Sequence, residues 1–134
     1  MMPASIVLFY AALLTLLLIA LSLRVVTLRR RHRVGLGSGN VKELERAVRA
    51  QANFCEYVPI ALILLLLMEW SGEVPPWTLH FLGLTLLVGR LLHGVGLNQT
   101  DGISRGRFIG TLLTWSMLLI GSGLALGMSI GRLI

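Results

Sequence analysis

The stretch Met1–Leu23, MMPASIVLFYAALLTLLLIALSL, contains no charged residue and is followed by Arg24. About 20 apolar residues in an α-helix cross a hydrocarbon layer of about 30 Å. This stretch therefore predicts a transmembrane helix. A cleaved signal peptide is not favoured, because a basic start and a small-residue cleavage site are both missing.

The composition of the whole chain is that of a membrane protein. Of its 134 residues, 55% are hydrophobic and 13% are charged, and the mean hydropathy is +0.81, whereas soluble domains carry about 25% charged residues. We expect one domain over residues 1–134, with no large catalytic domain outside the membrane. Because Cys55 is the single cysteine, an internal disulfide and a cysteine-based zinc site are excluded, and no metal is expected.

Three further apolar runs follow the first. We expect an all-α membrane protein with a bundle of four transmembrane helices, at about residues 5–28, 44–70, 77–97 and 107–131. In the last run, Gly123, Gly127 and Gly131 recur every four residues. Such spacing favours the close approach of a neighbouring helix.

Basic residues are concentrated on one side of the expected bundle. Eleven of the twelve lie at the first and third connections: Arg24, Arg29, Arg30, Arg31, Arg33, Lys42, Arg46, Arg49, Arg90, Arg105 and Arg107. Because basic loops favour the cytoplasm, we expect both termini outside and the basic loops in the cytoplasm. The formal charge of +6 then indicates contact with membrane lipids rather than with nucleic acid.

Ionisable side chains within membrane spans are costly and point to function. The expected topology brings several ionisable residues to the inner third of the bilayer, where we expect one polar pocket. These residues are Arg46, Arg49, Glu56, Arg90, His93, Arg105 and Arg107.

The second helix presents two different polar faces. At 100° per residue, Arg49, Asn53 and Glu56 share a stripe with Tyr57 at its edge. Gln51 lies about 200° from Arg49, so a small ligand that binds both residues must lie between subunits. The alternatives are structural: an ion pair between Arg49 and Glu56, a packing role for His93, a lipid contact for the basic loop, and Cys55 as a small hydrophobic residue.

The run Glu45–Pro59, ERAVRAQANFCEYVP, closely resembles the second-helix signature of the MAPEG superfamily. These membrane-associated proteins in eicosanoid and glutathione metabolism include microsomal glutathione transferases and leukotriene-C synthase. The resemblance, which extends over nearly the whole chain, is to bacterial-type members. It implies a homotrimer in a bacterial inner membrane, with glutathione held between subunits near the cytoplasmic face.

The resemblance also implies roles for individual residues. Glutathione contacts are expected from one subunit at Arg49, Asn53, Glu56 and Tyr57, and from its neighbour at Gln51 and at Arg29 or Arg30. Arg90 and His93 match the histidine form of a third-helix motif, in which Leu97 replaces a second tyrosine. Arg107 or Arg105 would stabilise the thiolate, and the following residues Phe108–Thr111 favour Arg107.

We therefore expect a glutathione transferase or peroxidase that uses glutathione as co-substrate. Its second substrate would be a lipophilic electrophile or hydroperoxide that enters from the bilayer. The chemistry agrees, because arginines suit the carboxylates of glutathione, Glu56 suits its ammonium, and a nearby cation favours the nucleophilic thiolate. The alternatives are a non-catalytic glutathione- or lipid-binding scaffold and, less favoured, a small four-span transporter.

The charge asymmetry makes the topology testable. With both termini outside, cysteines introduced in the stretch Glu73–Pro76 should react with an impermeant reagent added from outside. Cysteines at Ser38, within the stretch Gly35–Asn40, and in the stretch Asn98–Ser104 should not react from outside while the membrane is intact. Labelling at Ser38 from outside would contradict this orientation.

Overall fold

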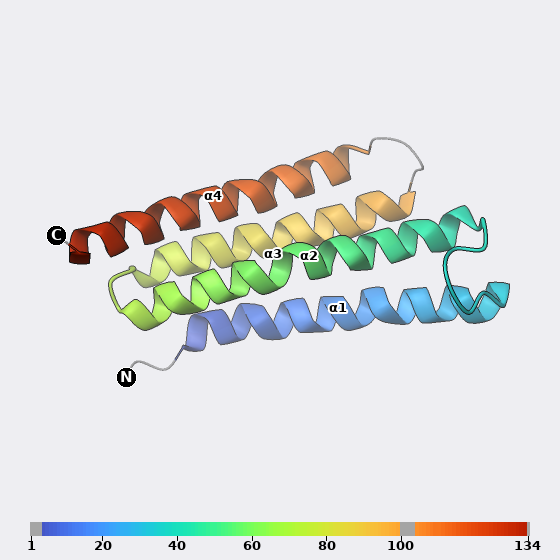
Figure 1. The fold of residues 1–134 in the computed structure, drawn as a ribbon, viewed down its shortest axis with the longest axis horizontal. Coiled ribbons are helices and arrows are strands. Elements are labelled where there is room, and N and C mark those ends of the chain that lie inside the picture. The colour runs from blue at the N-terminus through green and yellow to red at the C-terminus, as the bar shows by residue number, and fades with distance from the viewer. Residues whose placement is uncertain (1–3, 100–103, 134) are drawn as a thin grey trace.

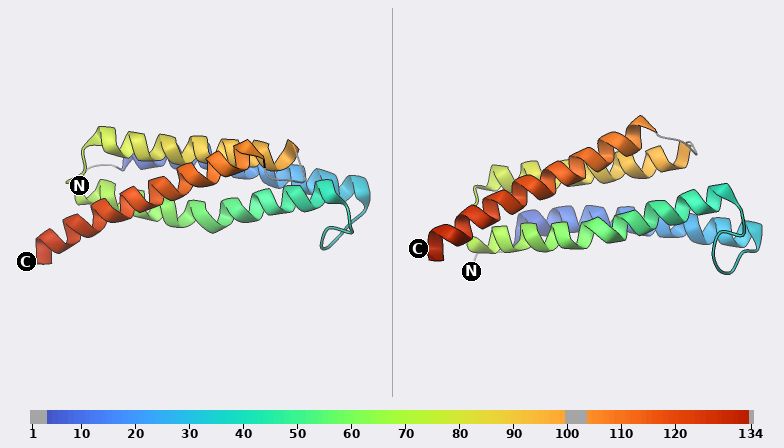
Figure 2. Two further views of the ribbon diagram at one scale, coloured as in Figure 1. Left: turned by 90° about the horizontal axis from the view of Figure 1, so that it is seen from above. Right: turned by 45° about the horizontal axis from the view of Figure 1, so that its top comes forward.

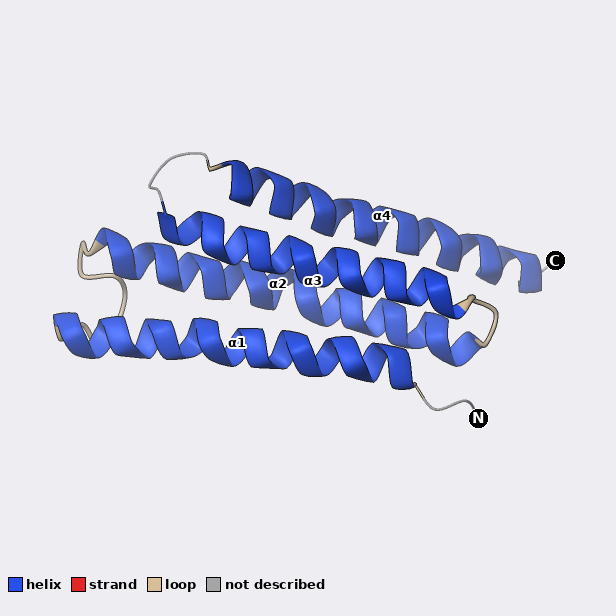
Figure 3. Ribbon diagram, turned by 180° about the vertical axis from the view of Figure 1, so that it is seen from behind, coloured by secondary structure: helices blue, strands red, loops and turns tan. Residues whose placement is uncertain are grey.

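The structure is a computed structural model that describes residues 4–99 and 104–133. It consists of four helices, α1 (Ser5–His32), α2 (Lys42–Ser71), α3 (Pro76–Gln99) and α4 (Arg105–Leu133), which run alternately in opposite directions (Figure 1). Short loops make up the rest of the described chain (Figure 3). All four helices are long and apolar enough to cross a membrane, so the expected all-α bundle of four spans is confirmed.

Each helix extends a few residues beyond the expected span. The largest extension at a single end is in α1. Its last turn contains Arg29, Arg30, Arg31 and His32, and the helix ends where Arg33 adopts a left-handed conformation, with φ 56°. At about 1.5 Å per residue, its 28 residues make a helix of about 42 Å. The arginine-rich end of α1 therefore extends past the hydrocarbon layer.

Part of the predicted connection Asn98–Ser104, residues 100–103, lies outside the described residues.

The middle of the bundle is formed by α2 and α3. In the described chain α1 packs on α2 and α3, α4 packs mainly on α3, and α1 and α4 do not contact each other. Figure 2 shows α4 crossing the bundle obliquely. The core between the helices is built from large apolar side chains, including fully buried Leu14, Leu65, Leu82, Leu86 and Met117.

Glycines bring α3 and α4 together at one half of their length. A Cβ atom built on Gly110 would lie 2.5 Å from the carbonyl oxygen of Gly89, and one on Gly96 would lie 2.5 Å from the backbone nitrogen of Arg107. Gly106 fits closely against the backbone at Leu92 and Gly96 in the same way. Only residues without a Cβ allow two helix backbones to approach so closely.

The glycine repeat in the second half of α4 has a different environment. Cβ atoms on Gly123, Gly127 and Gly131 would meet nothing within 4 Å, and all three residues are exposed in the single chain. The prediction that these glycines receive a neighbouring helix is therefore wrong within the chain. The oblique path of α4 is the reason, because its tight contact with α3 is at the Gly106–Gly110 end (Figure 2).

A buried carboxylate on α2 completes the first turn of α1. No side chain of α1 itself caps this helix at Ala4. Instead the backbone N–H groups of Ile6 and Val7 donate to the two carboxylate oxygens of Glu69, at 2.9 and 2.8 Å. Amide groups at a helix start need such acceptors, and a negative charge is favourable there.

The glycine contact between α3 and α4 predicts an asymmetry between two substitutions in α4. Gly110→Ala should lower the free energy of unfolding by about 1–3 kcal/mol, because the added methyl group collides with backbone atoms. Gly123→Ala, which meets open space, should be neutral or slightly stabilising. Unfolding in mixed micelles measures both values, and equal losses would contradict the assignment of the tight contact to Gly110.

Candidate functional site

Arg90 on α3 lies at the centre of the polar residues inside the bundle. Its side chain is buried, with 2% of its surface exposed. Its Nη2 atom donates to Oδ1 of Asn53 at 3.0 Å, and its guanidinium carbon lies 5.8 Å from the ring centroid of Tyr57. Two predicted ligand residues of α2 are thus joined to a third on α3.

The hydrogen bonding of Arg90 is incomplete. Its Nε and Nη1 atoms are buried and have no hydrogen-bond partner among the described residues. A buried donor without a partner costs about 1–3 kcal/mol, and more for a charged group. The unmet guanidinium nitrogens are therefore suited to an acceptor from outside the chain, such as a carboxylate or water.

The start of α4 adds a second arginine to this region. The hydroxyl of Ser104 accepts the backbone N–H of Arg107 at 3.1 Å and donates to the carbonyl of Gly96 at 3.0 Å, so it caps α4 and holds it to α3. His93 is 6% exposed and lies where α3 meets the first turns of α4, against Gly110. The side chain of Arg107 is half-buried, whereas Arg105 is exposed.

Two charged residues of α2 point out of the chain. Arg49 and Glu56 are both exposed, while Ala50 and Phe54 of the same helix are buried in the core. No salt bridge joins Arg49 and Glu56, both of which belong to the described chain. The alternative of a structural ion pair between them is therefore wrong for this structure.

Three predicted ligand residues lie on the α1 side of the bundle. Nε2 of Gln51 donates to Oγ of Ser22 at 2.8 Å. Nη1 of Arg29 donates to the carbonyl of Gly37 at 2.9 Å, and Arg30 is exposed. Because α1 does not contact α4 in the described chain, these residues are separated from Arg107 by the α2–α3 pair.

One chain thus assembles only part of the predicted site. It brings together Asn53, Tyr57, Arg90, His93 and Arg107, and it presents Arg49 and Glu56 on the adjoining outer face of α2. Gln51, Arg29 and Arg30 are on another side, and Arg105 points outward. Within one chain, no single small ligand could contact all of the predicted residues.

Known proteins are similar to this chain over most of its length. The sequence profile of the MAPEG family matches residues 7–127. The chain belongs to the MAPEG family. It is also similar to the inner membrane protein YecN of Escherichia coli strain K12 and to the protein of that name in Escherichia coli O6:H1 strain CFT073. Each is 42% identical over 111 residues, which are 83% of this chain and 82% of the relative.

Some residues that shape the site of this MAPEG protein were not predicted. Ser104 could have been recognised as a helix cap, because serine is favoured there and Arg105 begins the helix. The bond from Gln51 to Ser22 has no sequence signal, because serine is common in apolar helices. Asp101, an acid that could meet Arg107, lies outside the described residues, as does the side chain of Leu97.

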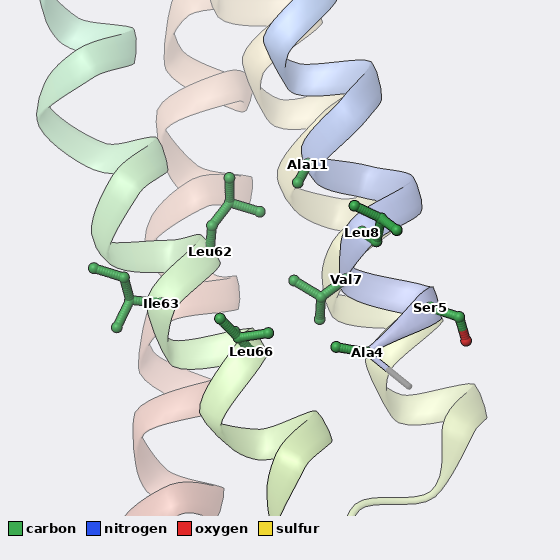
Figure 4. A pocket seen from close by; sticks show the side chains of 8 residues that line it. All are labelled: Ala4, Ser5, Val7, Leu8, Ala11, Leu62, Ile63 and Leu66. Carbon is green, nitrogen blue, oxygen red and sulfur yellow. The ribbon is translucent and has the colours of Figure 1, made fainter. Parts of the chain in front are cut away.

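The MAPEG bundle also has an apolar surface groove between α1 and α2. One part, of about 450 Å³, is lined by side chains such as Val7, Leu8, Leu62 and Leu66 (Figure 4). A second part, of about 250 Å³, shares Leu62 and reaches Cys55, next to Glu56. The two parts share Leu62 and follow one another along the contact between α1 and α2.

Proposed function

We propose that the protein is a glutathione transferase or peroxidase of the membrane, which holds glutathione between the subunits of a homotrimer. The observation that carries the proposal is the pair of uncovered charges on α2, next to a buried arginine with unmet donors. Family membership supports a glutathione-related function. A second subunit is proposed because one chain cannot bring all of the predicted site residues to one small ligand.

The carboxylate of Glu56 lies at a depth in the membrane where it must be shielded from lipid. It lies about 21 Å along α2 from Lys42, at about 1.5 Å per residue, which is the middle of a 30-residue helix. Because α2 is longer than the hydrocarbon layer, Glu56 lies inside this layer toward its basic side, where a charge that faces lipid is costly. A neighbouring subunit and a polar ligand would remove Glu56 and Arg49 from the hydrocarbon.

The chemistry of glutathione fits the groups that need partners. Its two carboxylates suit Arg49 and the free nitrogens of Arg90. Its ammonium suits Glu56, and Asn53, Tyr57 and His93 are close enough to Arg90 to contribute to the same pocket. Gln51, with Arg30 or Arg29, would come from the neighbouring subunit.

Arg107 is our proposed stabiliser of the thiolate, with Arg105 as the second choice. Its half-buried position beside His93 supports this role, since a nearby cation lowers a thiol pKa and the thiolate is the nucleophile. In conjugation the thiol proton leaves to water, sulfur bonds to the electrophilic carbon, and the leaving group departs with its electron pair.

A hydroperoxide would react with two glutathione molecules. The first thiolate attacks the terminal oxygen of the hydroperoxide, the O–O bond breaks, and the lipid oxygen leaves and is protonated to an alcohol. The second thiolate displaces the hydroxyl from the resulting sulfenic acid, giving the disulfide and water. The apolar α1–α2 groove supports entry of such a lipophilic substrate from the bilayer (Figure 4).

The proposed location is a bacterial inner membrane, with the site on the cytoplasmic side. The name of the E. coli relatives supports the membrane, and the concentration of arginines at one end of the bundle supports the orientation.

A shared site predicts complementation between defective subunits. Arg49→Ala and Gln51→Ala should each weaken glutathione binding when present in every subunit. Co-expression of the two variants should produce mixed trimers with an intact site, because the two residues act from different subunits. Calorimetry of the mixture measures recovered binding, and binding no better than that of either variant alone would contradict a site between subunits.

The role of Arg107 predicts a separation of binding from turnover. Arg107→Ala should leave glutathione binding nearly unchanged, remove the thiolate absorbance in the ultraviolet, and reduce conjugation of a model electrophile by about 10²-fold or more. Arg105→Ala, a matched change at an exposed position, should retain all three properties. Loss of activity only in Arg105→Ala would reverse the roles, and binding without turnover in the unmodified protein would indicate a scaffold.

A further inference from the structure

The loop between α1 and α2 is held in a defined shape. Val34 packs against the small apolar cluster where α1 meets α2, which includes Leu28 and Leu44. Nη1 of Arg29 donates to the carbonyls of Gly37 and Val34, at 2.9 and 3.5 Å. Gly39, at φ +56°, fits closely against the side chain of Val34. These contacts hold the loop in place both before and after residues 35 and 36.

These contacts leave one leucine outside. Leu36 is 92% exposed, the highest value among the large apolar residues of the described chain. It lies between the two carbonyls that Arg29 holds, so its exposure follows from the shape of the loop. Arg30, Arg31 and Arg33, at the adjoining end of α1, are exposed as well. A single apolar side chain thus projects from a surface that is otherwise strongly basic.

The loop lies beside the bundle rather than beyond it. Figure 1 shows residues 33–41 folded back alongside the ends of α1 and α2, and Figure 2 shows them on the side away from α3 and α4. Because α1 is longer than the hydrocarbon thickness, its arginine-rich end lies at the level of the lipid headgroups. The loop that carries Leu36 is therefore at the level of the lipid headgroups rather than in bulk water.

We propose that Leu36, Arg31 and Arg33 form an interfacial contact with anionic phospholipids. Leu36 inserts at the boundary between headgroups and acyl chains, and the two guanidinium groups bind the phosphates. Apolar and basic groups on one surface are the chemistry of an interfacial membrane contact, and arginine matches phosphate with paired hydrogen bonds. The contact needs no glutathione and is independent of the proposed function.

The test places a probe at the tip of the loop. In a Cys55→Ser background, Leu36→Cys is labelled with an environment-sensitive fluorophore, and the full-length protein is reconstituted in phosphatidylcholine vesicles with increasing phosphatidylglycerol. Emission should rise several-fold with phosphatidylglycerol and be quenched by lipids that carry a quencher near the headgroup. Inorganic phosphate added to pure phosphatidylcholine vesicles should not reproduce the rise.

Charge variants test the arginines in the same assay. Arg31→Gln/Arg33→Gln should raise the phosphatidylglycerol fraction needed for half of the change by at least about fivefold, because each of the two basic residues contributes about fivefold to binding at an anionic surface. Arg132→Gln, at the opposite end of the bundle, should leave it unchanged. A probe that stays open to an aqueous quencher in both lipids overturns the proposal. So does a probe shielded from both quenchers, which would place Leu36 against a second copy of the chain.

Discussion

The absence of water from the hydrocarbon layer is the constraint on which the rest of this structure depends. Backbone amides and charges inside the layer must find partners within the protein or its ligands. This requirement explains why the chain uses four long helices, why the carboxylate of Glu69 reaches the first turn of α1, and why Asn53 accepts from the guanidinium of Arg90. By the same requirement a single chain is incomplete, since Glu56 and Arg49 have no polar partner in the described chain.

The glycines between α3 and α4 determine the geometry of the candidate site. With side chains at Gly96, Gly106 and Gly110, the two backbones could not approach as closely as they do. Arg107 lies in the first turn of α4, close to α3, because of this approach, and Ser104 fixes it by bonding to both helices. The position of Arg107 relative to His93 is thus determined by glycines and a serine, which carry no charge.

The sequence predicted the four helices well, because an uncharged apolar run of about 20 residues is rare outside helices that cross a membrane. It also predicted that Arg90 lies with the polar residues of α2, since charges in apolar spans gather together, and Arg90 does bond to Asn53. It did not predict which glycines receive a helix, because Gly106 and Gly110 have the same spacing as Gly123 and Gly127. Spacing indicates which residues share a face, whereas the path of the neighbouring helix decides which part of that face is covered.

The bond between Glu69 and the start of α1 also bears on how the chain is made. Because synthesis proceeds from the N-terminus, α1 is produced before the carboxylate that completes its first turn. Its amides at Ile6 and Val7 obtain this partner only when the end of α2 has crossed to the same side of the membrane. The two helices therefore reach their final state as a hairpin, and a slip of α2 by one turn, about 5.4 Å, would break both bonds at once.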